Sequence, residues 1–147
     1  MGEVLKFHTE NTLSYVAGII DGEGCIGINI THVNGRHGQI YDHMMLRVEV
    51  ASTSRKLIDF LLNEFGGQFN AGKRPNRKPY YKWTVAALQG EKFLRLIYPY
   101  LLIKRDQAEI VFKFRATTKT PGQKLSVDEV AFRRKCYEEL RNLKRAI

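Results

Sequence analysis

The sequence predicts an α+β fold in which one four-stranded antiparallel sheet has helices on one of its faces. Several segments repeat apolar residues with the period of a helix, and two pairs of segments alternate apolar and polar residues with the period of a strand. Along the chain the order is helix, two strands, helix, two strands and then further helices. Because the apolar side of each strand pair must be covered, we expect the pairs to join in one sheet beneath the helices.

The first helix is expected over residues 13–22, with Asn11 or Thr12 as its cap. Its pattern ends at Gly22 and Gly24, and the period then changes to two. The apolar residues Ile26, Ile28 and Ile30 now alternate with small or polar residues. This change of period predicts that a strand directly follows the helix.

Two hairpins are expected, separated by a helix. The turn-forming run 34–38 divides the first strand from a second one around residues 44–50. An apolar stripe over residues 54–65, ended by two glycines, predicts the helix. The second hairpin has Phe69 on one strand and Tyr81, Trp83 and Val85 on the other, joined by the basic loop 73–79.

The C-terminal third is expected to be helical. A third helix from about Gln89 stops before Pro99, and a fourth begins near Lys104. Residues 117–124 are expected to form a loop. The last helix opens with the capping box of residues 126–129 and continues to the end of the sequence.

The charge of the chain favours a polyanionic partner. It has 24 Lys and Arg against 15 Asp and Glu, a formal net charge of +9, so nucleic acid is the first candidate and a merely soluble basic surface the alternative. Cys25 and Cys136 form no metal-binding motif, which indicates reduced thiols in an intracellular protein, cytoplasmic or organellar. The length suits a single domain, 1–147, and no apolar run suits a membrane.

The polar side of the predicted sheet has the residue types that contact DNA. Arg, Asn, Gln and Lys hydrogen-bond to base edges in the major groove, which a β-ribbon can enter, and loop cations bind phosphates. An ordinary solvated sheet face is the alternative, and the basic loop and net charge favour DNA. The expected DNA-binding residues are Asn29, Thr31, Arg36, Tyr41, His43, Arg47, Glu49, Gln68, Asn70, Lys73, Arg74, Arg77, Lys78, Tyr80, Lys82 and Thr84.

Glycines and acids in the first helix indicate both a packing surface and a metal site. Gly18 and Gly22 share one helix face, where another helix backbone can approach closely. Asp21 and Glu23 lie at the C-terminal end of this helix, where the helix dipole disfavours negative charge. A cation would offset that cost, and oxygen ligands favour Mg²⁺ or a similar hard ion such as Mn²⁺.

These nine residues, VAGIIDGEG from Val16 to Gly24, resemble the signature of the LAGLIDADG homing endonuclease family. The resemblance extends over residues 13–116, and it is carried by the segments VASTSR at 50–55, KPYYKW at 78–83 and YPYLLIKRDQA at 98–108. It implies an αββαββα unit with a saddle-shaped sheet. Because the chain has one motif, the resemblance also implies the homodimeric class, in which paired signature helices serve a near-palindromic target.

The resemblance also implies roles for individual residues. Glu23 matches the metal ligand, where Glu replaces the commoner Asp, and the backbone carbonyl of Gly22 is a further ligand. Lys104 matches the active-site lysine, whereas Asp21 matches an acid that is structural more than catalytic. Ser52 stands where relatives often carry Gln, and Arg55 near a basic position, so both are candidate catalytic residues. The implied dimer interface comprises Val16, Ala17, Gly18, Asp21 and Gly22.

The implied activity is metal-dependent hydrolysis of phosphodiester bonds in a long double-stranded DNA target by an intron-encoded enzyme. Two alternatives keep the fold: a maturase that acts on intron RNA, and a DNA-binding protein without catalysis. A plain basic ribonucleoprotein component is a third, but it would have no use for the glycines and acids of the motif.

Overall fold

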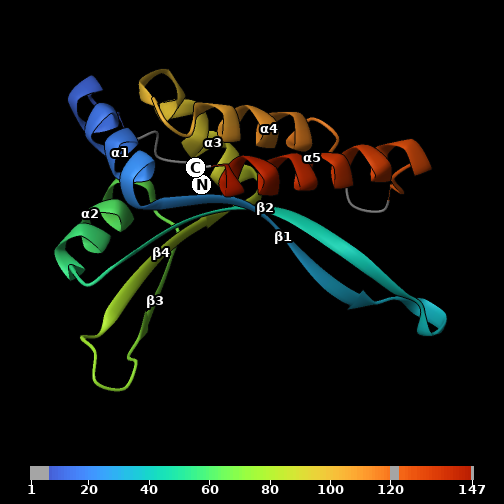
Figure 1. Ribbon diagram of the computed structural model, residues 1–147, viewed down its shortest axis with the longest axis horizontal. Coiled ribbons are helices and arrows are strands. Elements are labelled where there is room, and N and C mark those ends of the chain that lie inside the picture. The colour runs from blue at the N-terminus through green and yellow to red at the C-terminus, as the bar shows by residue number, and fades with distance from the viewer. Residues whose placement is uncertain (1–6, 120–122, 147) are drawn as a thin grey trace, which may run out of the picture.

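One antiparallel sheet organises the computed structural model, which describes residues 7–119 and 123–146. Its strands are β1 (Gly24–Asn34), β2 (Ile40–Ser52), β3 (Gln68–Gly72) and β4 (Tyr80–Ala86), in the order β1-β2-β4-β3. The strands form an arch with the helices on its convex side and an open concave face beneath (Figure 1). The α+β fold with a four-stranded antiparallel sheet and helices on one face is therefore confirmed.

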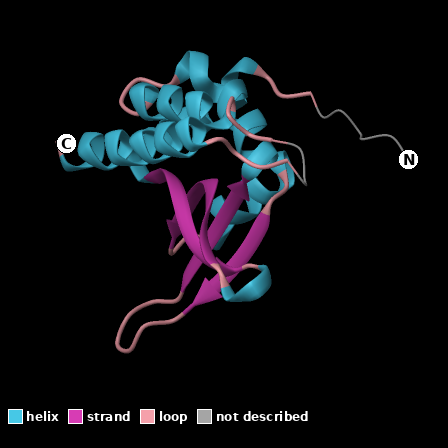
Figure 2. Ribbon diagram, turned by 90° about the vertical axis from the view of Figure 1, so that its right-hand side faces the viewer, coloured by secondary structure: helices cyan, strands magenta, loops and turns pink. Residues whose placement is uncertain are grey.

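The α-helices lie together on the convex side of the sheet in both views, whereas the short 3-10 helix Arg36–Gly38 lies at the end of the first hairpin (Figures 1 and 2). Among the described residues, the α-helices are α1 (Glu10–Glu23), α2 (Arg55–Phe65), α3 (Ala87–Ile97), α4 (Arg105–Arg115) and α5 (Val127–Arg145). None of them, within the part of the chain described, is long and apolar enough to cross a membrane.

Two helix starts differ from the prediction. α1 begins earlier than residue 13, because Thr9 is its N-cap and accepts the N–H of Thr12 at 3.1 Å. α3 begins at Ala87, directly where β4 ends. The capping box at Ser126 and Glu129 is confirmed, with both of its reciprocal hydrogen bonds present. Of the predicted loop 117–124, residues 120–122 lie outside the described residues.

The hydrophobic core lies between the helices and the convex face. The strands contribute the side chains Ile26, Ile28, Leu46, Val48, Val50, Trp83 and Val85, each at most 5% exposed. The indole N–H of Trp83 donates to the carbonyl of Gly66 at 2.7 Å, which satisfies the one polar atom of this side chain. Each strand buries alternate residues in this way and turns the others to the concave face.

The strand register fixes which residues share the concave face, because directly opposite residues of an antiparallel pair lie on the same side. Thr31 lies opposite His43. On the inner strands Glu49 lies opposite Thr84, which in turn lies opposite Gln68. Asn70 lies opposite Lys82. The polar side that the sequence predicts is therefore one continuous surface across all four strands.

Candidate active site and nucleic-acid interface

The C-terminal end of α1 is fixed to the segment before α4 by the side chain of Asp21. Its carboxylate accepts three backbone N–H groups, from Leu102 at 2.9 Å, Ile103 at 3.1 Å and Lys104 at 2.9 Å. The last of these residues is the N-cap of α4, where a negative charge is favoured by the helix dipole. Asp21 is thus occupied within the fold, in agreement with the structural role that its place in the motif implies.

Lys104 joins the same two segments through its own side chain. Its ammonium donates to the carbonyl of Ile20 at 2.9 Å and to the carbonyl of Gly24, the C-cap of α1. The cation therefore lies at the helix end whose dipole favours positive charge. Burial lowers the pKa of Lys104 below the ordinary lysine value; Cys25 and Asp21 act against this shift and Lys144 acts with it.

Gly24 allows the sharp change from α1 to β1. A Cβ at this position would lie 2.8 Å from the Cα of Ile20 and 2.9 Å from its carbonyl oxygen, closer than real Cβ atoms come. Only glycine fits without moving the backbone, so this residue holds the end of the helix tightly over the first strand. The preceding residue, Glu23, is exposed there.

The donors at this junction suit a hard divalent cation. Mg²⁺ is commonly bound by one or two carboxylates together with substrate phosphates. Glu23 offers an exposed carboxylate at the last position of α1, and Gly22 is exposed beside it. In residues 7–119 and 123–146 no three His, Cys, Asp or Glu side chains converge as a complete ligand set. The oxygen-only donors present fit Mg²⁺ or Mn²⁺ with the remaining positions filled by phosphate and water.

Ser52 and Arg55 have contacts of their own. Ser52, at the end of β2, accepts the N–H of Ser54 at 3.0 Å. Arg55 pairs with Asp59 at 3.6 Å and lies over the rings of Phe69 and Tyr81, residues of the apolar side of the second hairpin. The structure therefore brings Glu23 and Lys104 to the same helix end, and gives Arg55 a set of partners on another part of the molecule.

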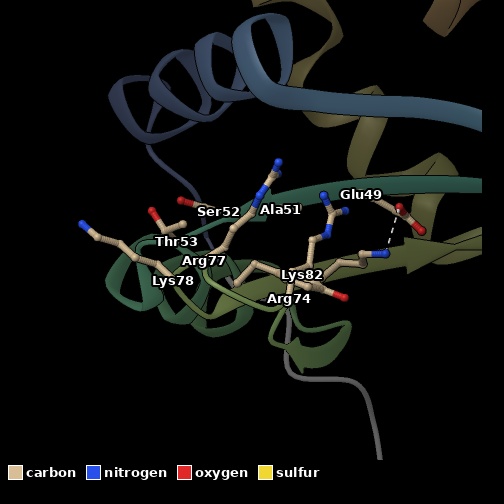
Figure 3. A pocket seen from close by; sticks show the side chains of 9 residues that line it. Glu49, Ala51, Ser52, Thr53, Arg74, Arg77, Lys78 and Lys82 are labelled. Atoms are coloured by element: carbon tan, nitrogen blue, oxygen red, sulfur yellow. Dashed lines mark ion pairs between the residues drawn. The ribbon is translucent and has the colours of Figure 1, made fainter.

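A basic hollow lies on the concave face near the end of β2. It has a volume of about 510 Å³ and is lined by Glu49, Ala51, Ser52, Thr53, Arg74, Arg77, Lys78, Tyr80 and Lys82. Figure 3 shows the cations of the loop between β3 and β4 gathered around it with Lys82 of β4. This concentration of positive charge beside hydrogen-bonding groups suits a phosphate backbone.

An ion-pair cluster lies on the same face. Glu49 pairs with Arg47 at 2.5 Å and with Lys82 at 3.8 Å, so one carboxylate holds two cations in place. Preorganised cations lose less side-chain entropy when they bind a base or a phosphate. Arg47, Glu49 and Lys82 therefore form an ion-paired group on the concave face.

Three of the expected DNA-binding residues need a correction or fall outside the description. Thr84 is on the concave face but only 2% exposed, since residues on both neighbouring strands cover it, so it cannot reach a base edge. The side chains of Arg36 and Tyr41 lie outside the described part of the structure. The other expected residues are exposed or half-exposed: Asn29, Thr31, His43, Arg47, Glu49, Gln68, Asn70, Lys73, Arg74, Arg77, Lys78, Tyr80 and Lys82.

The outer face of α1 is open around its glycines. Gly18 and Gly22 have nothing within 4 Å of where a Cβ would stand. They line a hollow of about 530 Å³ with Ser14, Tyr15, Ile19, Glu23 and Leu57. Val16 and Ala17, which the resemblance assigns to the interface, are instead fully buried in the core, because they lie on the opposite side of the helix.

Lys144 lies beside the junction between α1 and β1, although sequence reasoning did not single it out. It lies in the last turn of α5, and its ammonium is 3.4 Å from the thiol of Cys25 at the start of β1. Nothing in the local sequence distinguishes it from the other cations of α5. Its position is set only by the packing of α5 against α4 and β1.

No protein-family model matches the sequence, and no curated protein matches it. Solved structures match closely in fold. The chain is similar to the archaeal intron-encoded homing endonuclease I-Vdi141I complexed with DNA, with a TM-score of 0.73 and 16% identity over 91% of this chain and 84% of that chain. It is also similar to the homing endonuclease I-CvuI in complex with its target in the presence of Ca. The TM-score is 0.62 and the identity 19%, over 87% of this chain and 93% of that chain.

A third similar structure is the I-LtrWI LAGLIDADG homing endonuclease bound to target DNA. Its TM-score is 0.63 at 16% identity, over 94% of this chain but only 47% of that chain. This chain thus matches nearly all of I-CvuI and about half of I-LtrWI. With the VAGIIDGEG motif at the end of α1 and the basic concave sheet beneath it, the chain has the fold of the LAGLIDADG homing endonucleases.

Proposed function

We propose that this protein is a site-specific DNA endonuclease that acts as a homodimer with a divalent metal ion. The observation that carries the proposal is the meeting of Glu23 and Lys104 at one end of α1, above a basic concave sheet. An exposed carboxylate and a half-buried ammonium beside a phosphate-binding surface are the groups that phosphodiester hydrolysis needs. The target is a long, near-palindromic DNA duplex.

The roles at the centre follow from the position of each group. Glu23 and the backbone carbonyl of Gly22 would hold the metal, which would supply activation of a water molecule and stabilisation of the leaving oxygen. The Lys104 ammonium stabilises the charge that develops on the phosphate, and its hydrogen bonds to α1 fix its distance from Glu23. Asp21 positions Lys104 by holding the backbone of residues 102–104.

The concave face supplies target recognition. Base edges are read by the hydrogen-bonding side chains of the strands, and phosphates are held by the loop cations around the hollow. The cluster of Arg47, Glu49 and Lys82 lies on the floor of this surface, where it discriminates between bases. Specificity is therefore spread over many weak contacts along the groove.

A second copy of the chain is the proposed occupant of the open face of α1. The missing side chains at Gly18 and Gly22 allow two α1 helices to approach closely, and Tyr15, 60% exposed, is buried by the same contact. Pairing through this face brings two copies of Glu23 close together, one for each DNA strand. The two concave sheets then form one long reading surface with twofold symmetry.

The test is cleavage of a plasmid library that carries a randomised target segment, incubated with the purified full chain and Mg²⁺. Cut plasmids are recovered and sequenced. We expect wild type to enrich a near-palindromic site, and Glu23→Gln or removal of Mg²⁺ to abolish the enrichment. Glu10→Gln, which alters an exposed acid at the other end of α1, is the matched control and should cut like wild type. If wild type and Glu23→Gln give the same background level of cut plasmids, the nuclease assignment is refuted.

Binding measurements beside the cleavage experiment separate the alternative functions. A DNA-binding protein without catalysis would retain and enrich a target in a binding selection while wild type and Glu23→Gln cut nothing. A maturase would bind its intron RNA more tightly than the DNA duplex of the same sequence. No feature of the described residues favours the RNA.

A further inference from the structure

A lysine of the C-terminal helix reaches the concave face at the active centre. The Nζ of Lys144 lies 3.4 Å from the Sγ of Cys25, and a Cβ on Gly27 would lie 3.5 Å from the same atom. Cys25 is opposite Glu49 and Gly27 is opposite Arg47, so both positions belong to the concave face. Because α5 itself lies on the helical side and β1 is an edge strand, the Lys144 side chain crosses the edge of the sheet.

This position places Lys144 beside the proposed catalytic groups. Cys25 follows the short segment Glu23-Gly24, and the carbonyl of Gly24 is held by the ammonium of Lys104. Burial lowers the pKa of Lys104; Cys25 and Asp21 oppose this shift, and the charge of Lys144, the weakest of these influences, adds to it. Two like charges thus approach the same helix-to-strand junction from different helices.

Within the described residues, Lys144 has no carboxylate partner. Among the ion pairs of residues 7–119 and 123–146, none joins a carboxylate to Lys144. Its polar neighbour is a thiol, which is a weak acceptor. The two α5 residues one turn earlier, Leu140 and Arg141, are not acids either. Lys104 has the carboxylate of Asp21 nearby, whereas Lys144 has no carboxylate partner among the described residues, so the added positive charge favours an anion bound beside the two lysines.

We propose that Lys144 binds a phosphate of the DNA strand that lies against Glu23 and Lys104, so that the two lysines hold that phosphate from opposite sides. Lysine suits this task because its ammonium is a compact charge that accepts many geometries of phosphate oxygen. The C-terminal helix thereby completes the active centre. This inference rests on the proposed function, since it places the phosphate beside the proposed catalytic residues.

The test compares Lys144→Ala and Lys144→Arg with Lys135→Ala. Lys135 is on the same helix nine residues earlier, which at about 100° per residue is the opposite side, and its exposed ion pair with Glu139 is local. All variants are first checked by thermal unfolding. Because Cys25 is only a weak partner, we expect each to melt like wild type.

The first measurement needs no known target. The affinity for a fixed random-sequence duplex is measured without metal at several salt concentrations. Removing one phosphate contact lowers the slope of log affinity against log salt by about 0.9 for each protomer bound to the duplex. We expect this loss for Lys144→Ala, its recovery in Lys144→Arg, and the wild-type slope for Lys135→Ala. A wild-type slope for Lys144→Ala would overturn the inference.

The second measurement uses the duplex recovered from the plasmid library, cut under single-turnover conditions at saturating enzyme. We expect Lys144→Ala to cut at least tenfold more slowly, a loss of about 1.4 kcal/mol of transition-state stabilisation. If wild type cuts and Lys144→Ala cuts equally fast, the phosphate contact is refuted while the proposed function stands. If wild type cuts nothing but the salt slope depends on Lys144, the proposed function fails while the contact holds.

Discussion

Asp21 and Lys104 hold each other's helices: the Asp21 carboxylate accepts the N–H groups that precede α4, and the Lys104 ammonium donates to the carbonyls that end α1. The two side chains thus cross between the same two segments in opposite directions. Each also neutralises part of the dipole of the other residue's helix. The position of Lys104, the proposed catalytic lysine, therefore depends on Asp21, although Asp21 is not expected to touch DNA.

Asp21→Asn should separate cleavage from binding. An amide presents one acceptor and two donors to the three N–H groups, so at least one of them loses its partner. We expect a loss of about 1–3 kcal/mol in the free energy of unfolding, together with a large fall in the cleavage rate and little change in DNA affinity. Urea unfolding and single-turnover cleavage measure the two effects. Asp106→Asn, in the exposed first turn of α4, should change neither.

Gly18→Leu should disrupt the dimer and leave the protomer folded. Nothing in the protomer lies within 4 Å of a Cβ at this position, so the side chain meets no obstacle in its own chain. In a close helix pair the same side chain would collide with the partner. Sedimentation should show monomers at concentrations where wild type is dimeric, with an unchanged circular dichroism spectrum. A dimer as stable as that of wild type would contradict the assigned interface.

Gly24→Ala, unlike Gly18→Leu, should destabilise the protomer itself. The added Cβ would lie 2.8 Å from the Cα of Ile20, a backbone atom that cannot move aside as the end of a flexible side chain can. Overpacking of this kind costs about 1–3 kcal/mol, so the midpoint of urea unfolding should fall. Because the end of α1 must shift, cleavage should fall as well. A variant with the stability of wild type would show that the junction relaxes freely.

Arg77→Ala and Lys82→Ala should differ in how they affect specificity. Arg77 is an exposed loop cation at the hollow, so its loss should weaken binding to all duplexes alike and reduce the salt slope by about 1. Lys82 is held by Glu49 on the strand surface, so its loss should change base preference. Binding selections from the same library, repeated with each variant, distinguish a uniform loss from an altered consensus.

Glu91→Gln should reduce stability in a pH-dependent manner. Burial of Glu91 raises its pKa, but hydrogen bonds from Arg115 and Arg95 outweigh this and hold the pKa below the ordinary value of 4.5. A carboxyl whose pKa is lowered by folding stabilises the native state above its unfolded pKa, and this contribution is lost as the pH falls through the folded value.

At neutral pH the substitution should therefore cost about 1–3 kcal/mol, because the Arg115 side chain is only 14% exposed and loses its partner. The difference between wild type and Glu91→Gln should shrink as the pH falls from about 5 to 3. Urea unfolding at a series of pH values measures it. Glu138→Gln, an exposed change on α5, should show no such trend.

The alternation of the strands made most of the fold predictable. Period-two patterns such as Ile26, Ile28 and Ile30 identify the strands and their faces, because one face must be buried and a slip by one residue would expose it. The helix ends were less predictable, since Thr9 and Ala87 are selected by local hydrogen bonding and by where the neighbouring strand stops.

The site was predictable only where a motif specified it. Glu23 and Lys104 were found because the residues around them resemble a known signature, and the structure brings both to the end of α1. Burial cannot be read from one residue type alone, so polar Thr84 was assigned to the exposed sheet face and Val16 to the interface, although both are buried. Lys144 depends on tertiary packing between α5 and the edge of the sheet, for which local sequence has no signal.

The division of each strand into two faces has a consequence for how such a protein changes over time. Core residues such as Val48 and Trp83 alternate with the concave residues Glu49 and Lys82 along the same strands. A substitution on the concave side thus alters the proposed recognition surface without opening a cavity or displacing the helix ends at the proposed reaction centre. Under the proposed function, the protein could acquire new DNA targets by successive single changes while its folding is preserved.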